Sequence, residues 1–136
     1  MQTYIQALLQ RHAYGDARMV IQEAMRNRWR PALLPDYVRA AQTDSITDQL
    51  KMCDAWQNLG YADDALYTTA GQLCIRAQMW GQAKKNFDDA IRLNPSIVNY
   101  SGLAQALNGM GDTAGAQAAE HQASRLNQVN VLHHDN

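Results

Sequence analysis

The chain has 136 residues, of which 46% are hydrophobic and 18% are charged, and its formal net charge is −1 at pH 7. This length and composition are typical of a single globular domain that buries a core without help from disulfides. A net charge near zero argues against a dedicated nucleic-acid-binding protein, which normally presents a clearly basic face. No apolar run approaches the roughly 18 residues that a membrane-spanning helix needs, and no signal-peptide pattern opens the chain.

Helix-forming residues dominate the composition. Alanine and glutamine are plentiful, whereas phenylalanine occurs once and proline three times. Strand-forming residues are correspondingly scarce, so the sequence predicts an all-α fold.

Charge is distributed unevenly along the chain. Residues 1–42 contain six arginines against three acidic residues, whereas the remainder carries an excess of acidic residues. An Arg-rich, solvated helix face is the simpler interpretation of this pattern. An anionic partner or a nearby membrane surface is the alternative.

Apolar residues at helical spacing predict helices that follow one another in pairs. In the first pair, helices cover residues 3–12 and 16–27, with Gly15 ending the first helix and Asp16 capping the second. In the second pair, a short helix is expected after Pro35.

A longer helix over residues 46–59 completes the second pair. Ser45 or Thr47 is the expected cap of this helix, and Gly60 is expected to stop it in the left-handed conformation that glycine adopts without strain. This pair is the less regular one, because Gln49 stands where a small residue is expected.

Residues 64–95 form the best-defined pair, with helices over about 65–78 and 81–93. Asp63 or Asp64 caps the first helix, and Pro95 ends the second. Gly71 and Ala83 are small enough to let these two helices approach closely, and Phe87 is expected to fill the space between this pair and the next.

A last pair is followed by a short tail. A turn over residues 109–112 separates its two helices, and the second of them is poor in large apolar residues, which suits a terminal helix with little left to cover. The predicted pairs span residues 3–27, 31–60, 64–95 and 96–127 within a single domain over 1–128, and residues 129–136 are predicted to be a disordered tail.

The helix pairs repeat with a nearly constant period. Ala17, Gln49, Ala83 and Ala116 lie thirty-two, thirty-four and thirty-three residues apart, each near the start of a second helix. A period near 34 in helix–turn–helix units is the signature of the tetratricopeptide repeat.

The third pair resembles the tetratricopeptide consensus closely. The matching residues are Tyr67, Ala70, Gly71, Cys74, Ala83, Phe87, Ala90 and Pro95. The last pair matches at Tyr100, Leu103, Leu107, Gly111 and Ala116, while Ala104 and Glu120 replace the glycine and the aromatic residue. This resemblance implies a right-handed α-solenoid of three to four stacked helical hairpins.

A narrower resemblance covers most of the chain. Residues 70–73 (AGQL) and 80–83 (WGQA) occupy the places of a Leu-Gly-x-Leu helix and a Trp-Gly-x-Ala turn, and the chain is similar to the carboxy-terminal region of HemY-type bacterial proteins. The resemblance implies a cytoplasmic repeat domain without catalytic activity. In the full protein that domain is attached to membrane helices at the inner membrane and is linked to haem biosynthesis. The sequence departs from the family by lacking the membrane segment and the preceding repeats, so either it is an excised domain or the resemblance is only to the repeat architecture.

No catalytic or metal-binding pattern is present in the sequence. The four histidines lie in different units or in the tail, and none is spaced from cysteines or carboxylates as metal ligands are; they are His12, His121, His133 and His134. Cys53 and Cys74 fall on apolar helix stripes and are expected to pack in the core, so neither a disulfide nor an axial haem ligand is predicted. We therefore expect no enzyme activity, cofactor or metal.

The remaining route to function is a partner-binding groove. Stacked helix pairs curve, and their first helices line a concave face that accepts an extended peptide or a partner helix. The first-helix positions turned away from the predicted core are Thr68, Gln72, Ile75 and Arg76 in the third pair, Leu34, Val38 and Gln42 before it, and Ser101, Gln105 and Asn108 after it. Among them, the predicted partner-binding residues are Thr68, Gln72, Arg76, Gln105 and Asn108.

Three functions are compatible with these observations. The first is a protein-interaction scaffold with a protein or peptide partner, without nucleic-acid binding or membrane insertion by this chain itself. The second is a self-associating structural module that forms homo-oligomers. The third is a tetrapyrrole-binding domain. The groove positions are also open to a plainer interpretation as solvated surface.

Overall fold

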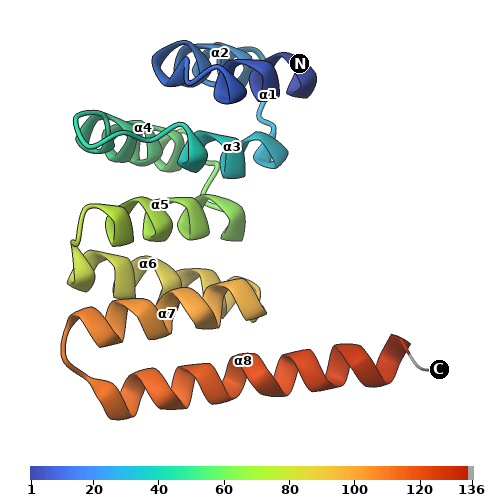
Figure 1. Ribbon diagram of the computed structural model, residues 1–136, viewed down its shortest axis with the longest axis vertical. Helices are drawn as coiled ribbons and strands as arrows, with labels where there is room; N and C mark the ends of the chain where they lie inside the picture. Colours follow the sequence, from blue (N-terminus) through green and yellow to red (C-terminus); the bar gives the residue numbers. More distant parts are fainter. Residues whose placement is uncertain (135–136) are drawn as a thin grey trace.

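The computed structural model describes residues 1–134, with side chains described as far as Val129. All regular structure in this range is helical, which confirms the all-α class (Figure 1). The helices are α1 (Gln2–Gln10), α2 (Tyr14–Asn27), the 3₁₀ helix η1 (Pro31–Leu33), α3 (Leu34–Arg39), α4 (Ile46–Asn58), α5 (Asp64–Arg76), α6 (Trp80–Leu93), α7 (Ile97–Gly109) and α8 (Thr113–His134).

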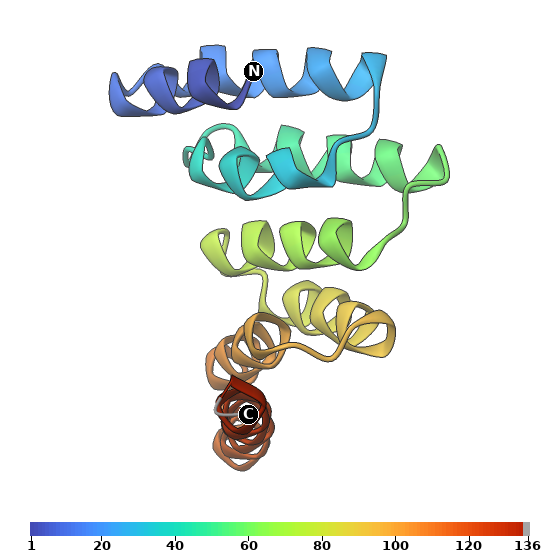
Figure 2. The same ribbon diagram turned by 90° about the vertical axis from the view of Figure 1, so that its right-hand side faces the viewer.

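The helices are arranged in layers from α1 and α2 at one end to α8 at the other (Figure 1). The odd-numbered helices pack on one another in chain order, α1 on α3, α3 on α5 and α5 on α7. Figure 2 shows α8 nearly end-on while α1 and α2 lie across the view, so the helix direction turns along the molecule. The odd-numbered helices therefore share one continuous face.

The ring of Phe87 on α6 is held between glycines of two other helices. A Cβ atom added at Gly71 on α5 would lie 2.8 Å from the Phe87 ring, and one added at Gly102 on α7 would overlap the same ring. The sequence predicts the close approach at Gly71 and the position of Phe87, but it does not single out Gly102. The packing of α5, α6 and α7 thus depends on two positions without a side chain.

A buried glutamine explains the irregular second pair. Gln49 on α4 is 1% exposed and occupies the place that Ala83 takes in the next pair. Its Nε2 donates to the carbonyl of Tyr37 at 2.8 Å, and the hydroxyl of Ser45 donates to its Oε1 at 2.7 Å. Both ends of the amide are therefore satisfied, and the Gln49–Tyr37 hydrogen bond joins α4 to α3.

An aromatic cluster anchors the segment between α2 and η1. Trp29 stacks on Tyr61 with ring centroids 4.6 Å apart and meets the edge of Trp56. Its indole Nε1 donates to Asp63 Oδ2 at 3.0 Å, while Asp63 Oδ1 caps α5 by accepting from the backbone N–H of Leu66 at 2.8 Å. Asp63 thus confirms the predicted cap and also fixes the position of Trp29.

The first predicted turn is wrong in detail. The residue with left-handed backbone geometry is His12 (φ 61°), and α2 begins at Tyr14, so Gly15 lies inside the helix rather than ending the previous one. Asp16 lies in the first turn of α2, and no side-chain cap holds this helix end.

Gln78 (φ 59°) makes the same turn between α5 and α6, so both turns place a polar residue where glycine is usual. At Gly60 (φ 100°) the predicted helix stop is confirmed.

The last helix is longer than the sequence predicts. α8 has 22 residues against 13 in α7, and it runs past α7 at its carboxyl end (Figure 1). The backbone of residues 129–134 is helical, which corrects the predicted disordered tail over that range, while residues 135–136 lie outside the described residues. The helix continues because neither glycine nor proline follows Gly115 to interrupt it.

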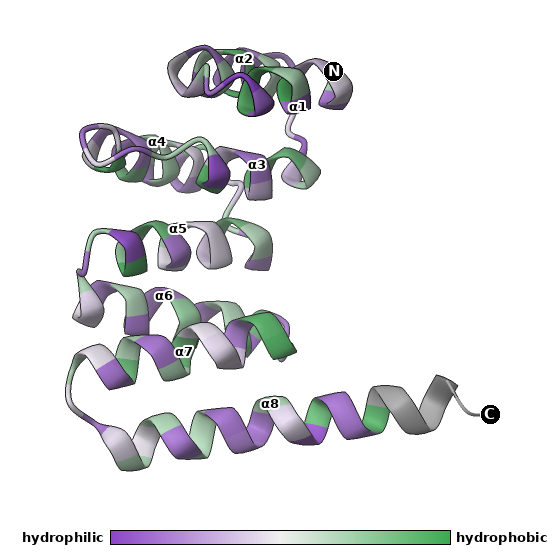
Figure 3. Cartoon of the chain, viewed as in Figure 1, coloured by the Kyte–Doolittle hydropathy of each residue, from purple (hydrophilic) through white to green (hydrophobic). Residues whose placement is uncertain are grey.

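Polar and apolar residues are interleaved along the helices. Figure 3 shows hydrophilic positions recurring throughout the described part of α8, the longest helix. Among the described residues, no helix combines the length and the apolar character that crossing a bilayer requires.

Alanine substitutions at two glycines test the packing around Phe87. Gly71→Ala is expected to lower the free energy of unfolding by about 1–3 kcal/mol, because the new methyl group meets the Phe87 ring. Gly81→Ala on α6 is the matched control: apart from its chain neighbours and the adjacent backbone of α6, no atom lies within 4 Å of its added Cβ. The higher helix propensity of alanine should therefore stabilise the fold by up to about 1 kcal/mol. Urea denaturation of both variants measures the difference, and equal effects would contradict the packing described.

Candidate functional site

Two adjoining hollows lie on the face formed by α3, α5 and α7. The first, the basic hollow, has a volume of about 330 Å³. It is lined by Val38, Arg39, Gln72, Ile75, Arg76 and Gln105. The second, the apolar hollow, has a volume of about 500 Å³ and is lined by residues that include Leu34, Pro35, Asp64, Thr68, Gln72 and Val98. Gln72 lines both, so the two hollows meet at the middle of α5.

Four of the five predicted groove residues line these hollows. Thr68 and Gln72 line the apolar hollow, and Gln72, Arg76 and Gln105 line the basic one. Asn108 is exposed on α7 but borders neither hollow. Helical periodicity therefore places most of the predicted residues on one hollowed surface.

The hydroxyl of Thr68 is engaged in packing. It lies 2.6 Å from Asn99 Oδ1 on α7 and 2.9 Å from the carbonyl of Asp64. Asn99 is 2% exposed, and its Nδ2 donates to the carbonyl of Asn94 at 3.0 Å. Thr68 thus joins α5 to α7 and is not free to donate to a ligand.

Arg76 holds the carboxyl end of α3. Its Nη1 donates to the carbonyl of Val38 at 2.6 Å, with the carbonyl of Ala41 at 3.5 Å. Arg18 of α2 reaches the same end, since its Nη1 donates to the carbonyl of Ala40 at 2.8 Å. Cations at a helix carboxyl terminus are stabilised by the unpaired carbonyl groups and by the helix dipole. Arg18 and Arg76, which come from different layers, therefore both hold the carboxyl end of α3.

The charge of Arg76 remains uncompensated by an acid. Carbonyl oxygens accept its hydrogen bonds, and within residues 1–134 no carboxylate forms an ion pair with its guanidinium. Arg76 is exposed, so its remaining donors face solvent in the basic hollow. This arrangement leaves a positive charge available to an anionic group.

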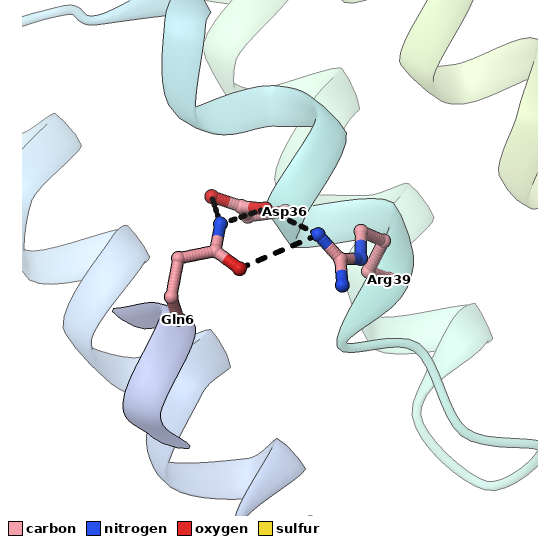
Figure 4. A network of polar contacts seen from close by, with 3 residues as sticks. All are labelled: Gln6, Asp36 and Arg39. Atoms are coloured by element: carbon pink, nitrogen blue, oxygen red, sulfur yellow. Dashed lines mark hydrogen bonds and ion pairs between the residues drawn. The ribbon is translucent and has the colours of Figure 1, made fainter. Parts of the chain in front are cut away.

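Arg39 is a second cation of the basic hollow, and its role is not predicted from the sequence. Figure 4 shows it on α3 beside Asp36 and Gln6. Gln6 Nε2 donates to both carboxylate oxygens of Asp36 at 3.0 and 3.1 Å, and Arg39 Nη1 lies 3.5 Å from Asp36 Oδ1. The Arg39 side chain stays 62% exposed. Helical periodicity predicts that Val38 lies on this surface, but it does not predict that the adjacent Arg39 borders the basic hollow.

Gln72 and Gln105 are the groove amides left free. Gln72 is half-buried and Gln105 is exposed, and among the described residues neither side-chain amide is held by a hydrogen bond. A free primary amide both donates and accepts, which is what the backbone of a bound peptide requires. The uncommitted polar groups of this face are therefore these two amides and the outer donors of two arginines.

The other positions predicted on this surface differ in burial and in whether they line a hollow. Val38 lines the basic hollow, whereas Leu34 is 1% exposed and forms a wall of the apolar one. Gln42 receives a hydrogen bond from Arg18 at 3.1 Å and lies outside both hollows, as does the exposed Ser101.

The histidines do not come together in the described part of the chain. His12 is exposed, with Nδ1 2.8 Å from the hydroxyl of Tyr14, and His121 is exposed on α8. The side chains of His133 and His134 lie outside the described residues. Among those described, no group of three or more His, Cys, Asp or Glu residues is placed to hold a metal ion.

Both cysteines are free and buried. The pKa of Cys53 is raised to about 12 and that of Cys74 to about 11, and burial of each thiol is the largest cause of its shift. At pH 7 both thiols are therefore neutral, which suits a packing role and disfavours thiolate ligation.

These pKa shifts predict a loss of stability in alkali. Because the pKa of each folded thiol lies above its unfolded value near 9, the stabilisation is fully present below pH 9 and is lost as the pH rises towards 12. The free energy of unfolding in urea should fall between pH 9 and pH 11. A Cys53→Ala variant should show a shallower fall, and an identical slope would contradict the assigned cause.

Comparisons with known proteins found no match, whether against family models, curated proteins or solved structures.

Proposed function

We propose that the chain is a non-catalytic protein–protein interaction scaffold that binds a peptide segment of a partner protein on the α3–α5–α7 face. The observation that carries this proposal is the pair of adjoining hollows that meet at Gln72. Apolar walls with a few uncommitted polar groups are the usual composition of a binding site.

The proposed architecture is a right-handed α-solenoid of tetratricopeptide-like helical hairpins. It is supported by the near-constant period of the second helices and by the succession of contacts among the odd-numbered helices. In such an architecture the first helices line the concave surface. The two hollows are lined mainly by residues of α3, α5 and α7, which would be first helices in the proposed repeats.

We further propose that the chain is the repeat domain of a HemY-type membrane-anchored protein linked to haem biosynthesis, acting in the cytoplasm at the inner membrane. The support is the sequence resemblance at residues 70–73 and 80–83, which fall within α5 and at the start of α6. In this setting the scaffold would bring a partner protein to the membrane.

Selection of peptides on the immobilised chain tests the proposed face. Peptides chosen from a displayed random library should bind a Gln72→Ala/Gln105→Ala variant at least about tenfold more weakly, because two hydrogen bonds of roughly 1 kcal/mol each are lost. Arg76 is kept in this variant, since it holds α3.

The matched control is Gln117→Ala/Gln122→Ala on the exposed side of α8, which should leave affinity unchanged. Both variants are first compared with the parent chain by thermal unfolding. If the α5–α7 variant is folded and binds as tightly as the parent, the face is not the binding site.

Self-association is the second candidate function, and one observation favours it. Tyr4 on α1 and Met19 on α2 are 58% and 68% exposed at the amino-terminal end of the molecule. Large apolar side chains left in solvent at one end favour contact with a second copy.

A charged substitution tests this alternative. If the amino-terminal end mediates self-association, light scattering over a concentration series should show a dimer that Met19→Lys converts to a monomer. A parent chain that remains monomeric over the whole series excludes this function.

A further inference from the structure

The excess of arginine near the amino terminus is only partly used by the fold. Of the six arginines in residues 1–42, Arg26 and Arg39 form ion pairs, and Arg18 donates to the carbonyl of Ala40. Within the described part of the chain, the other three form no ion pair; they are Arg11, Arg28 and Arg30. Two of these three lie in one short segment, so unpaired positive charge is concentrated there.

The segment after α2 presents its two arginines on one side. The backbone is extended at Arg28 (φ −161°, ψ 131°) and is also non-helical at Arg30 (φ −134°, ψ 88°). Along an extended backbone, successive side chains point to opposite sides. Trp29 is turned towards the aromatic cluster, where it stacks on Tyr61 and donates to Asp63. The arginines on either side of Trp29 therefore share the outer side, and both are exposed.

Both arginines line a hollow of about 550 Å³ between the start of α1 and the start of η1. Met1, Gln2, Pro31 and Leu33 are among its other lining residues, and none of its lining residues is acidic. The hollow therefore combines two guanidinium groups with apolar walls.

A second hollow adjoins the first. It has a volume of about 370 Å³, shares Met1 with the first and is lined by α2 residues that include Met19, Val20 and Glu23. The Glu23 carboxylate lies 3.3 Å from Arg26 Nη1, so its charge is paired. The positive charge of the first hollow is thus not cancelled by the second.

Large apolar side chains stand beside the arginines. Met1 is 56% exposed, and Tyr4 and Met19 are exposed to a similar extent. Tyr4 lies one helical turn from Met1 on α1, which places both on one side of that helix. The amino-terminal patch consists of these three side chains and the neighbouring arginines, namely Met1, Tyr4, Met19, Arg26, Arg28 and Arg30. Exposed apolar side chains grouped in this way mark an interaction surface.

We infer that the amino-terminal patch binds the surface of a bilayer that contains acidic phospholipids. Arg28 and Arg30 bind lipid phosphates, because the planar fork of guanidinium N–H donors matches phosphate oxygens. Met19 and its apolar neighbours leave water for the boundary between headgroups and acyl chains. Charge and apolar area thus favour the same surface.

A second copy of the chain or a small anion fits the patch less well. A contact across a two-fold axis would bring both pairs of unpaired guanidinium groups into one interface, where they repel. A phosphate ion in solution would use the arginines alone and leave the exposed apolar side chains in water. An acidic bilayer surface accounts for both features.

Co-sedimentation with lipid vesicles tests the inference on the full chain. Vesicles made of equal parts dioleoylphosphatidylglycerol and dioleoylphosphatidylcholine should bind the chain at least about tenfold more tightly than vesicles of dioleoylphosphatidylcholine alone. Raising the salt concentration to about 1 M, where the Debye length is about 3 Å, should weaken this binding. Equal binding to both kinds of vesicle would overturn the inference.

A charge-matched pair of variants locates the contact. Arg28→Gln/Arg30→Gln should weaken binding to the acidic vesicles by about tenfold to thirtyfold, the size expected for two arginines at an anionic membrane surface. Lys85→Gln/Arg125→Gln removes the same charge from exposed positions on α6 and α8 and should change binding less than about twofold. Thermal unfolding checks that both variants are folded. Equal losses would mean that net charge, and not the patch, causes binding.

A fluorescent label tests the apolar part of the patch. Cys53 and Cys74 are buried, so a nitrobenzoxadiazole dye reacts selectively with an introduced cysteine. The dye at Met19→Cys should shift its emission to the blue on acidic vesicles, whereas the dye at Gln117→Cys on α8 should not. No shift at either position would overturn the contact of Met19 with lipid.

The remaining outcomes identify a different occupant. Saturable binding of glycerol 3-phosphate without binding to vesicles would assign the arginines to a phosphate in solution, and the inference would be overturned. A dimer in light scattering that Met19→Lys dissociates, again without binding to vesicles, would assign the patch to a second copy. Gln72 and Gln105 line neither of these hollows, so failure here leaves the proposed peptide-binding face untouched.

Discussion

The structure depends on how the short helix α3 is held in place. A helix of six residues is too short to be stable alone, and its last carbonyl groups have no partners within the helix. Arg18 from the preceding layer and Arg76 from the following one donate to these carbonyls, while Gln6 of α1 holds Asp36. Because α3 lies between α1 and α5, these contacts join the amino-terminal helices to the rest of the chain and build one wall of the basic hollow.

Periodicity alone locates the candidate face but does not show which of its side chains are free. Gln72 and Arg76 fall four residues apart on one helix stripe, so the sequence is enough to place both on the surface away from the core. The carbonyl partner of Arg76 depends on where α3 ends, and α3 is a short helix that follows a separate 3₁₀ turn. The hydrogen bond of Thr68 cannot be read from local sequence either, because its partner, Asn99, lies thirty-one residues away on α7. Contacts between layers are set by tertiary packing, which local patterns do not encode.

The fold is predictable where local signals agree with packing. Asp63 caps α5 and Gly60 takes the left-handed conformation, since Asp is among the residues favoured at a helix N-cap and glycine adopts positive φ without strain. The first turn is mispredicted because Gly15 is the obvious breaker, yet the left-handed residue is His12, whose conformation follows from the packing of α1 on α2. Residues 129–134 (VNVLHH) are mispredicted for the opposite reason: they contain neither glycine nor proline, so nothing in them stops a helix already formed.

Phe87 is the chain's single phenylalanine, and its ring lies between Gly71 and Gly102 at the junction of α5, α6 and α7. Gly71 adjoins one edge of the ring and Gly102 the other, so the ring has little room to rotate unless the helices move apart. Fluorine incorporated at the meta position of the ring lies off the flip axis, so slow flipping would give two ¹⁹F resonances, and their rate of exchange would report how often these three helices separate. The same glycines that allow the close packing thus make the chain's one phenyl ring a spectroscopic sensor of its internal breathing.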